Sequence, residues 1–215
     1  MTTTIPSPIL QVQGLSFAYP GQPALAAGWS TPIVAGVTLL HGDTGSGKST
    51  LLRVFAGELP ASGRLTLAGV RLDEDPAAYR RAVFWCDPAT DAFDQVTARA
   101  CTASLHAGDA GFDDACWHGL VEGFALAPHL NKPMYMLSTG SKRKVWLAAA
   151  LASGRALTLL DEPTGGLDTA SINFLTRTLA KLAERHDRAI VVASAERLAR
   201  VPLANAIELP LRQVA

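Results

Sequence analysis

A glycine-rich loop at positions 41 to 50, HGDTGSGKST, ends on a lysine and two hydroxyl side chains. It follows a short apolar strand, GVTLLHG, and opens a segment with helical spacing, STLLRVFAGEL. Because glycines permit backbone approaches that a Cβ would forbid, the amides of such a loop can converge on phosphate oxygens at the helix N-terminus. The loop therefore predicts a nucleotide-binding site. The expected binding residues are Gly42, Asp43, Thr44, Gly45, Ser46, Gly47, Lys48, Ser49 and Thr50.

Several side chains of this loop have expected tasks. The Lys48 ammonium group would reach the β- and γ-phosphates, and the Ser49 hydroxyl would hold Mg²⁺. Asp43 brings a carboxylate next to the phosphates, unless its side chain points away from them. A glycine-rich turn with an incidental lysine is the alternative interpretation. A full match between a strand and a helix favours nucleotide binding.

A pair of acidic residues follows another apolar run. The stretch ALTLLDEP places Asp161 and Glu162 directly after a buried strand. We predict that Asp161 faces the metal shell and that Glu162 faces an attacking water. An acidic pair that only caps a turn is the alternative. Together with Lys48, these two acids form the predicted catalytic set.

Composition limits the classes of function. The 215 residues include 19 Lys and Arg and 19 Asp and Glu, so a net charge of zero gives no support to nucleic-acid binding. Three cysteines without a CxxC pair indicate thiols in a reducing compartment. The start, MTTTIPSPIL, lacks the features of a signal peptide, and no apolar run reaches the ~20 residues that span a bilayer. We expect a cytoplasmic domain without direct membrane insertion.

Strand and helix patterns alternate along the chain, which indicates an α/β fold with a parallel sheet. ILQVQGLSFAYP and GRLTLAGVRL have strand character near the N-terminus, and RAVFWCD reads as a buried strand. SKRKVWLAAALAS and SINFLTRTLAKLAER read as helices around the strand that carries the acidic pair, and AIVVASAE is the last expected strand.

The segment from about 88 to 137 has a different texture and is predicted to be a helical insertion. Its clearest helix is FDDACWHGLVEGFAL, with Asp113 or Asp114 as the N-cap. The apolar residues on one face of that helix are Trp117, Leu120, Val121 and Phe124.

A third motif indicates which phosphate-loop family the chain resembles. MLSTGSKRK resembles the LSGGQ signature of ATP-binding cassette (ABC) ATPases at residues 137–141. The order of phosphate loop, helical segment, LSTGS and LTLLDEPTGGLD matches that family over nearly the whole chain. The resemblance implies a single ABC ATPase domain over 1–215. It would have a RecA-like P-loop NTPase core at about 1–87 and 138–215, an antiparallel N-terminal β subdomain and a helical subdomain at about 88–137.

The resemblance also implies a dimer, because this family holds ATP between the phosphate loop of one subunit and the signature of another. The second cassette could be identical or different. Ser138, Thr139 and Gly140 would complete the cage around the γ-phosphate from a helix N-terminus. Tyr19 matches the aromatic residue that stacks on adenine, with packing inside a strand as the alternative. Asp168 matches the D-loop near the dimer interface.

Two positions depart from the family pattern. The Q-loop glutamine is replaced by Asp87, which could still hold Mg²⁺ but cannot donate as an amide does, and Gln95 is the lesser candidate. Ala195 stands where the family has its switch histidine. Together these departures predict slow or partner-dependent hydrolysis. The basic run 142–144 is either a solvated helix face or a steering group for phosphate.

The leading functional prediction is the ATP-binding subunit of an ABC transporter, peripheral to the inner membrane through separate transmembrane permease subunits. The docking groove would lie near 87–96, with Phe93 either an exposed anchor or a core residue. A soluble ABC-type regulator is the alternative. A small-molecule kinase explains the phosphate loop but leaves LSTGS and DEPTGGLD without a role.

Overall fold

Two β-sheets with different hydrogen-bonding patterns organise residues 7–211, the part of the chain that the computed structural model describes. A four-stranded antiparallel sheet has the order β2-β1-β4-β5, and a five-stranded parallel sheet has the order β6-β7-β8-β3-β9. Residues 1–6, which include part of the stretch judged against a signal peptide, lie outside the described residues. The strands are β1 (Leu10–Phe17), β2 (Ala26–Ile33), β3 (Gly36–His41), β4 (Ser62–Leu67), β5 (Val70–Arg71), β6 (Val83–Phe84), β7 (Leu157–Asp161), β8 (Ala189–Ser194) and β9 (Asn205–Glu208).

The central strands of the parallel sheet are covered on both faces. Every residue of β8 is buried, as are all but the last residues of β3 and β7. Their sequences are continuous apolar runs because neither face meets water. The carboxyl ends of parallel strands lie at one edge of the sheet, so this edge carries the loop after His41, the acid Asp161 and the residue after Ser194.

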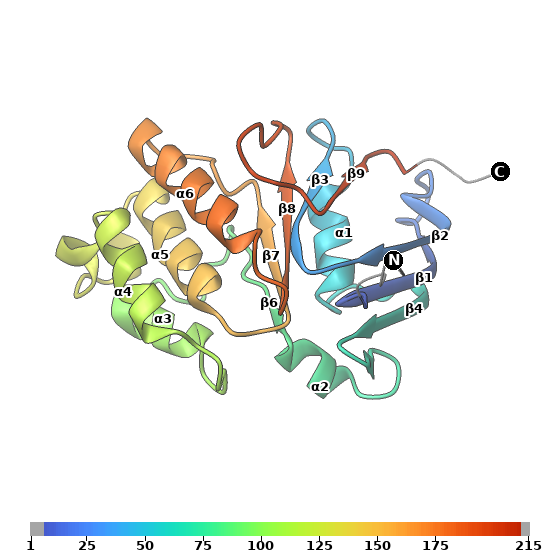
Figure 1. The fold of residues 1–215 in the computed structure, drawn as a ribbon, viewed down its shortest axis with the longest axis horizontal. Coiled ribbons are helices and arrows are strands. Elements are labelled where there is room, and N and C mark those ends of the chain that lie inside the picture. Colours follow the sequence, from blue (N-terminus) through green and yellow to red (C-terminus); the bar gives the residue numbers. More distant parts are fainter. Residues whose placement is uncertain (1–6, 212–215) are drawn as a thin grey trace, which may run out of the picture.

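Alternate residues of these strands contribute to two separate cores. Ile190 and Val192 of β8 pack with the helices on one side, whereas Val191 and Ala193 pack with helix α1 (Lys48–Phe55) and the antiparallel sheet. Figure 1 shows this division, with α3 to α6 on one side of the parallel sheet and α1 with the antiparallel strands on the other. The predicted α/β fold with a parallel sheet and an antiparallel N-terminal sheet is confirmed. The remaining helices are α2 (Pro76–Arg81), α3 (Ala98–Leu105), α4 (Asp114–Gly123), α5 (Thr139–Ala152) and α6 (Thr169–Leu182).

The named elements of the segment between β6 and α5 are all helical: α3, α4 and the short 3₁₀ turns η1 (Ala127–His129) and η2 (Met134–Met136). Asp113 caps α4, because its carboxylate accepts the Cys116 N–H at 2.8 Å. All four residues of the predicted apolar face are buried. The exact limits of a helical subdomain at 88–137 stay a prediction.

The structure differs from the sequence prediction at three elements. Helix α2 was not expected, although Asp75 caps it and Pro76 opens it. The strand expected in RAVFWCD is paired only over Val83–Phe84. A further strand, β9, follows β8 and pairs with β3, so the prediction that β8 is the last strand was wrong.

The turn between α5 and β7 is held by a close backbone contact. A Cβ on Gly154 would lie 2.3 Å from the carbonyl oxygen of Gly111, in the loop between α3 and α4. The carboxylate of Asp109 accepts the Gly154 N–H at 3.1 Å and the Ser153 hydroxyl at 2.7 Å. This contact fixes the loop between α3 and α4 next to the start of β7, which is the opposite end of that strand from Asp161.

We predict that Gly154→Ala lowers the free energy of unfolding by about 1–3 kcal/mol, because the added methyl group meets backbone that cannot move aside. Urea denaturation of the two proteins measures the difference. Gly119→Ala is the matched control: a Cβ there meets no atom within 4 Å, and the exposed helical position should gain about 0.5–1 kcal/mol. Equal stability of Gly154→Ala and the unaltered chain would contradict the close backbone contact between Gly154 and Gly111.

Candidate active site

The glycine-rich loop joins β3 to α1 in a conformation that requires two of its glycines. Gly47 has φ 97°, and a Cβ there would lie 2.4 Å from the Leu25 side chain. A Cβ on Gly42 would lie 2.6 Å from Ser46 Oγ and 2.9 Å from the Leu209 Cβ. Any other residue at these two positions would push the loop out of shape.

The loop, the end of β7 and the end of β8 surround one open cavity of about 410 Å³. This volume lies within the range of small-molecule sites. The cavity is lined by Thr44, Gly45, Gly47, Lys48, Ser49, Thr50, Glu162 and Ala195. Six of the nine predicted loop residues and one of the two predicted acids therefore face the same space.

Lys48 lies at the base of this cavity, and its residue is only 6% exposed. Its ammonium group donates to the carbonyl oxygens of Gly42 at 2.7 Å and Asp43 at 3.0 Å. It also forms an ion pair with Glu162, with 3.1 Å between Nζ and Oε1. A phosphate group in the cavity could take the place of the Glu162 carboxylate as the anionic partner of Lys48.

Asp161 ends β7 beside the phosphate loop. Burial raises the pKa of this carboxyl above its usual value, and a hydrogen bond with the Ser49 hydroxyl opposes that shift. Among the described residues, the buried oxygen Oδ1 of Asp161 has no hydrogen-bond partner. A carboxylate with a spare oxygen next to a hydroxyl is a donor set that suits Mg²⁺. Ser49 and Asp161 would hold the ion, which when bound would neutralise negative charge on the phosphates.

The Glu162 side chain is held at the rim of the cavity and is 41% exposed. Its carboxylate accepts the main-chain N–H of Ala195, at 3.1 Å to one oxygen and 3.4 Å to the other. Its backbone has φ 41°, a left-handed conformation that is strained for a residue with a Cβ. The carboxylate therefore lies between Lys48 and the end of β8, on the lining of the cavity.

Comparisons with known proteins agree with this geometry. The family model for ABC transporters matches residues 34–165. The cytochrome c biogenesis ATP-binding export protein CcmA of Rhodospirillum rubrum is 38% identical over 191 residues, which are 88% of this chain and 81% of that protein. The cobalt import ATP-binding protein CbiO of Rhodobacter capsulatus is 33% identical over 212 residues, covering 90% of this chain and 75% of that protein.

The chain belongs to the ABC transporter family. Among solved structures, an ABC transporter ATP-binding protein from Pyrococcus furiosus has the same fold, with a TM-score of 0.74. It is 21% identical, and the match covers 93% of this chain and 96% of that one. A structure of the ATP-binding subunit of an ABC transporter gives a TM-score of 0.72 at 23% identity, over 86% of this chain and 79% of that one.

Tyr19, at the position of the adenine-stacking aromatic of ABC ATPases, lies beside the phosphate loop. It is 41% exposed, its hydroxyl is 3.2 Å from the Thr50 hydroxyl, and its ring meets that of Phe17 edge-on at 5.0 Å. A tyrosine packed in the core would be enclosed, so this exposure argues against core packing. Its role in binding remains a prediction.

Asp43 and Asp87 are not among the residues that line the cavity. Asp43 takes part through its carbonyl oxygen, which accepts from Lys48 and from the Ser46 N–H at 3.1 Å. The exposed Asp87 carboxylate accepts the Ala89 N–H at 2.8 Å. The structure thus leaves the phosphate-binding role of the Asp43 side chain and the metal-binding role of Asp87 as predictions. Phe93 packs partly buried against the core.

The ABC signature lies at the N-terminus of α5, outside the cavity of its own chain. Ser138 caps the helix by accepting the Ser141 N–H at 3.1 Å, and both Ser138 and Thr139 are exposed. A Cβ on Gly140 would lie 2.3 Å from the carbonyl oxygen of Gly166. Glycine at 140 lets the signature pack directly against the D-loop.

The basic run after the signature has a role that its sequence did not indicate. Lys142 pairs with Asp94 at 2.5 Å, and Lys144 pairs with Asp168 at 2.8 Å. Arg143 donates to two main-chain carbonyls at the end of β7. Each cation of the run has a partner within the chain, so the run is not simply a solvated face. A steering role toward phosphate stays a prediction. A sequence pattern could not have identified these partners, which lie far away in sequence.

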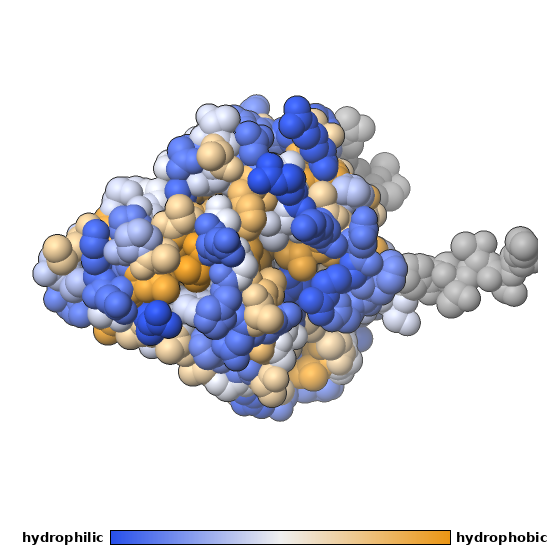
Figure 2. All heavy atoms as spheres, turned by 60° about the vertical axis from the view of Figure 1, so that its left-hand side comes forward, coloured by the Kyte–Doolittle hydropathy of each residue, from blue (hydrophilic) through white to orange (hydrophobic). Residues whose placement is uncertain are grey.

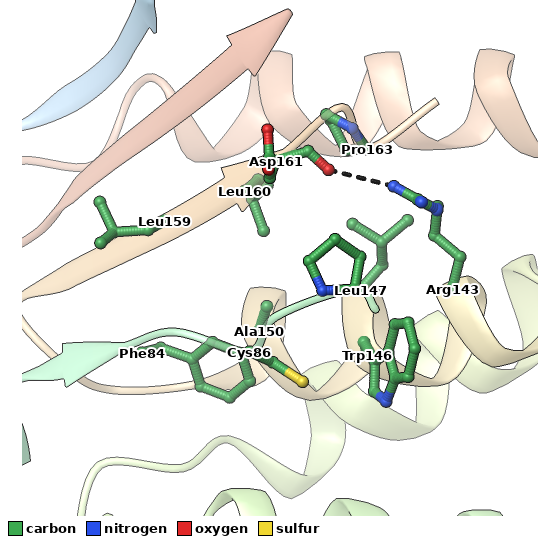
Figure 3. Close-up of a pocket in the computed structure, with 11 residues that line it drawn as sticks. Phe84, Cys86, Arg143, Trp146, Leu147, Ala150, Leu159, Leu160, Asp161 and Pro163 are labelled. Carbon is green, nitrogen blue, oxygen red and sulfur yellow. Dashed lines mark hydrogen bonds between the residues drawn. The ribbon is translucent and has the colours of Figure 1, made fainter. Parts of the chain in front are cut away.

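Figure 3 shows Arg143 beside a second, much smaller cavity of about 30 Å³. It lies between α5, the end of β7 and the segment after β6, where Cys86 and Pro88 face it. Burial raises the pKa of the Cys86 thiol to about 12, so this cysteine is an unreactive thiol at neutral pH. The three cysteines are free within the described residues, as expected.

We predict that Asp161→Asn raises the melting temperature of the nucleotide-free protein at neutral pH. The raised pKa means that folding disfavours the charged carboxylate, and the neutral amide removes that penalty. The gain should shrink as the pH falls through the raised pKa, and it should vanish below the ordinary pKa of aspartate, where the carboxyl is protonated in both states. Differential scanning calorimetry over a pH series, without Mg²⁺, measures it. A lower melting temperature of Asp161→Asn at neutral pH would contradict the raised pKa of Asp161.

Proposed function

We propose that the chain binds Mg-ATP and hydrolyses it slowly, as the ATP-binding subunit of a transporter. The observation that carries this proposal is the meeting of Lys48, Ser49 and Glu162 around one cavity, with Asp161 behind Ser49. Lys48 and the loop amides would bind the β- and γ-phosphates. Tyr19 would cover the adenine from the rim.

Glu162 would accept a proton from the water that attacks the γ-phosphate. This requires the carboxylate to move from Lys48 toward the water once the phosphates supply the charge that Lys48 needs. The Ala195 N–H still orients the carboxylate at 3.1 Å, but the Ala195 methyl group offers no polar contact to the phosphate. One missing preorganised donor costs on the order of a hundredfold in rate. Hydrolysis is therefore slow rather than abolished.

The exposed signature supports a dimer. Ser138, Thr139 and Gly140 do not line the cavity of their own chain, while the N-terminus of α5 offers free amides at its positive dipole end. A second cassette could place these groups on the nucleotide. Each ATP would then be enclosed by the phosphate loop of one subunit and the signature of the other.

Attachment to transmembrane permease subunits is the second part of the proposal. Within residues 7–211, no helix has the length and apolar character to cross a bilayer. Val96, Tyr135 and Met136 are exposed apolar residues, and backbone hydrogen bonds join their segments, from Met134 N to Val96 O and from Tyr135 N to Asp94 O. Figure 2 shows that the apolar surface on the helical side of the molecule forms separate areas among hydrophilic residues. Such a mixed surface suits a partner protein.

The relatives support a transport function but not a single cargo. CcmA is named for export in cytochrome c biogenesis, whereas CbiO is named for cobalt import and the relative NikO for nickel import. The shared part of these proteins is the ATP-binding machinery. The alternative of a soluble regulator gains no support from these names.

Glu162→Gln should reduce phosphate release by about 10²- to 10⁴-fold, because the amide cannot accept the proton. ATP affinity, measured by equilibrium titration, should change little, since the amide oxygen can still accept the Ala195 N–H. An unchanged rate would exclude Glu162 as the base.

Ala195→His should raise phosphate release on the order of tenfold or more, because the imidazole restores a donor beside the γ-phosphate. The main-chain N–H that holds Glu162 is retained in this variant. Steady-state phosphate release at saturating ATP measures the effect. If the unaltered chain releases phosphate as fast as Ala195→His, hydrolysis is not impaired by the alanine at 195.

The dimer is tested by mixing two inactive variants, Lys48→Ala and Ser138→Arg. If two copies form the dimer, every mixed dimer contains one intact site of two. Half of all dimers are mixed on statistical pairing, so about a quarter of the activity should return. Full activity of Ser138→Arg by itself would show that the site works without a second signature. No recovery on mixing two inactive variants would show that the second cassette is a different chain.

A further inference from the structure

Arg143 lies in the second turn of α5 and reaches across to the end of β7. Its Nη1 donates to the carbonyl oxygen of Asp161 at 3.0 Å and to that of Glu162 at 2.5 Å. Figure 3 shows the first of these hydrogen bonds, with the guanidinium group lying against the end of the strand. A charged donor is thus shared by two successive peptide groups, those of the metal-binding and the catalytic acid.

The backbone of Glu162 needs such support. Its φ of 41° is unfavourable for a residue with a Cβ and persists only where neighbouring contacts hold it. Three hydrogen bonds do so: its N–H donates to Ala193 O at 2.9 Å, its carbonyl accepts Gly165 N–H at 3.0 Å, and the same carbonyl accepts Arg143. This turn aims the side chain at Lys48 and the Ala195 N–H.

We propose that Arg143 is a positioning residue that holds the turn at Glu162, and so sets the direction of the Glu162 carboxylate. The inference rests on the proposed function, in which Glu162 is the base. Arg143 acts through the main chain of Glu162 and does not line the nucleotide cavity. Its position two residues beyond the signature motif links the direction of Glu162 to the placement of the α5 N-terminus.

Two neighbouring contacts make that link rigid. The backbone at Gly140 packs directly on the carbonyl of Gly166, and Lys144 forms an ion pair with Asp168 at 2.8 Å. Arg143 lies between these contacts in sequence. The start of α5 and the segment 161–168 therefore move together. A second cassette that draws on the signature would act on the catalytic acid of the same chain through Arg143.

A purely structural role makes a different prediction. The stem of Arg143 lines the smaller cavity with Trp146 and Leu147, so its methylene groups also fill space. Arg143→Met keeps an unbranched apolar stem and removes all donors, and Arg143→Lys keeps the charge with a single point donor. The matched control is Arg155→Met. Arg155 precedes β7 at its opposite end and also donates to two main-chain carbonyls, of Val83 at 3.2 Å and Leu105 at 2.9 Å.

The experiment measures phosphate release, ATP affinity and amide hydrogen exchange in the full-length chain. We expect Arg143→Met to lower kcat about tenfold or more, with the Kd for ATP changed less than twofold. Arg143→Lys should recover part of the loss. Arg155→Met should leave kcat of the folded protein unchanged even if its melting temperature falls. Loss of kcat together with weaker ATP binding, equally in both Met variants, would overturn the proposal in favour of general destabilisation.

A double-mutant cycle shows whether Arg143 acts through Glu162. In the Glu162→Gln background, Arg143→Met should cause no further loss, because the group that it positions is already inactive. An additional tenfold loss in that background would overturn the positioning role.

Hydrogen exchange gives a readout that does not depend on hydrolysis. The Ala195 amide should exchange faster in Arg143→Met than in Arg155→Met, because its acceptor carboxylate has moved. Unchanged exchange at Ala195 would overturn the proposal. Faster exchange combined with a rate insensitive to Glu162→Gln would uphold the positioning role and reject Glu162 as the base.

Discussion

A buried ammonium group is the constraint on which the site depends. Lys48 is almost entirely withdrawn from water, and a charge in such a place must be compensated. The chain supplies two carbonyl oxygens of the glycine-rich loop and the carboxylate of Glu162. The loop conformation, the end of β7 and the turn at Glu162 are all needed to bring these oxygens to one nitrogen. The same arrangement leaves the lysine ready to exchange a carboxylate for a phosphate.

The parallel sheet makes this convergence possible. Because β3, β7 and β8 run in the same direction, their carboxyl ends deliver the loop, the acidic pair and Ala195 to one edge. The acidic pair is then divided by its surroundings. Asp161 is half-buried, with a raised pKa and a spare buried oxygen, while Glu162 lies at the open rim. On the proposed function, adjacent residues of one type would thus take a metal-binding and a proton-accepting role from their positions alone.

Much of this arrangement could be predicted from the sequence, and the reasons are physical. Strands β3, β7 and β8 are continuous apolar runs because they are buried on both faces. The glycine-rich loop was recognisable because its glycines permit backbone conformations that other residues rarely adopt. Strand β9, with the sequence NAIE, is too short and too polar to show a period. The acceptors of Arg143 are main-chain carbonyls, which every residue has, so no pattern could identify them. The role of the basic run 142–144 could not be read from the sequence because the partners of its side chains lie far away along the chain.

Strand β9 also has a consequence for how the protein is made. The N–H of Leu209, just after β9, donates to the carbonyl of His41 at 2.7 Å, and its side chain abuts Gly42 at the start of the phosphate loop. A segment from the last tenth of the chain therefore supports a loop from its first quarter. During synthesis, the first 200 residues can leave the ribosome without this support. The phosphate loop is therefore supported only after the segment from β9 to Leu209 has been synthesised, and a chain cut short before that segment lacks the finished loop.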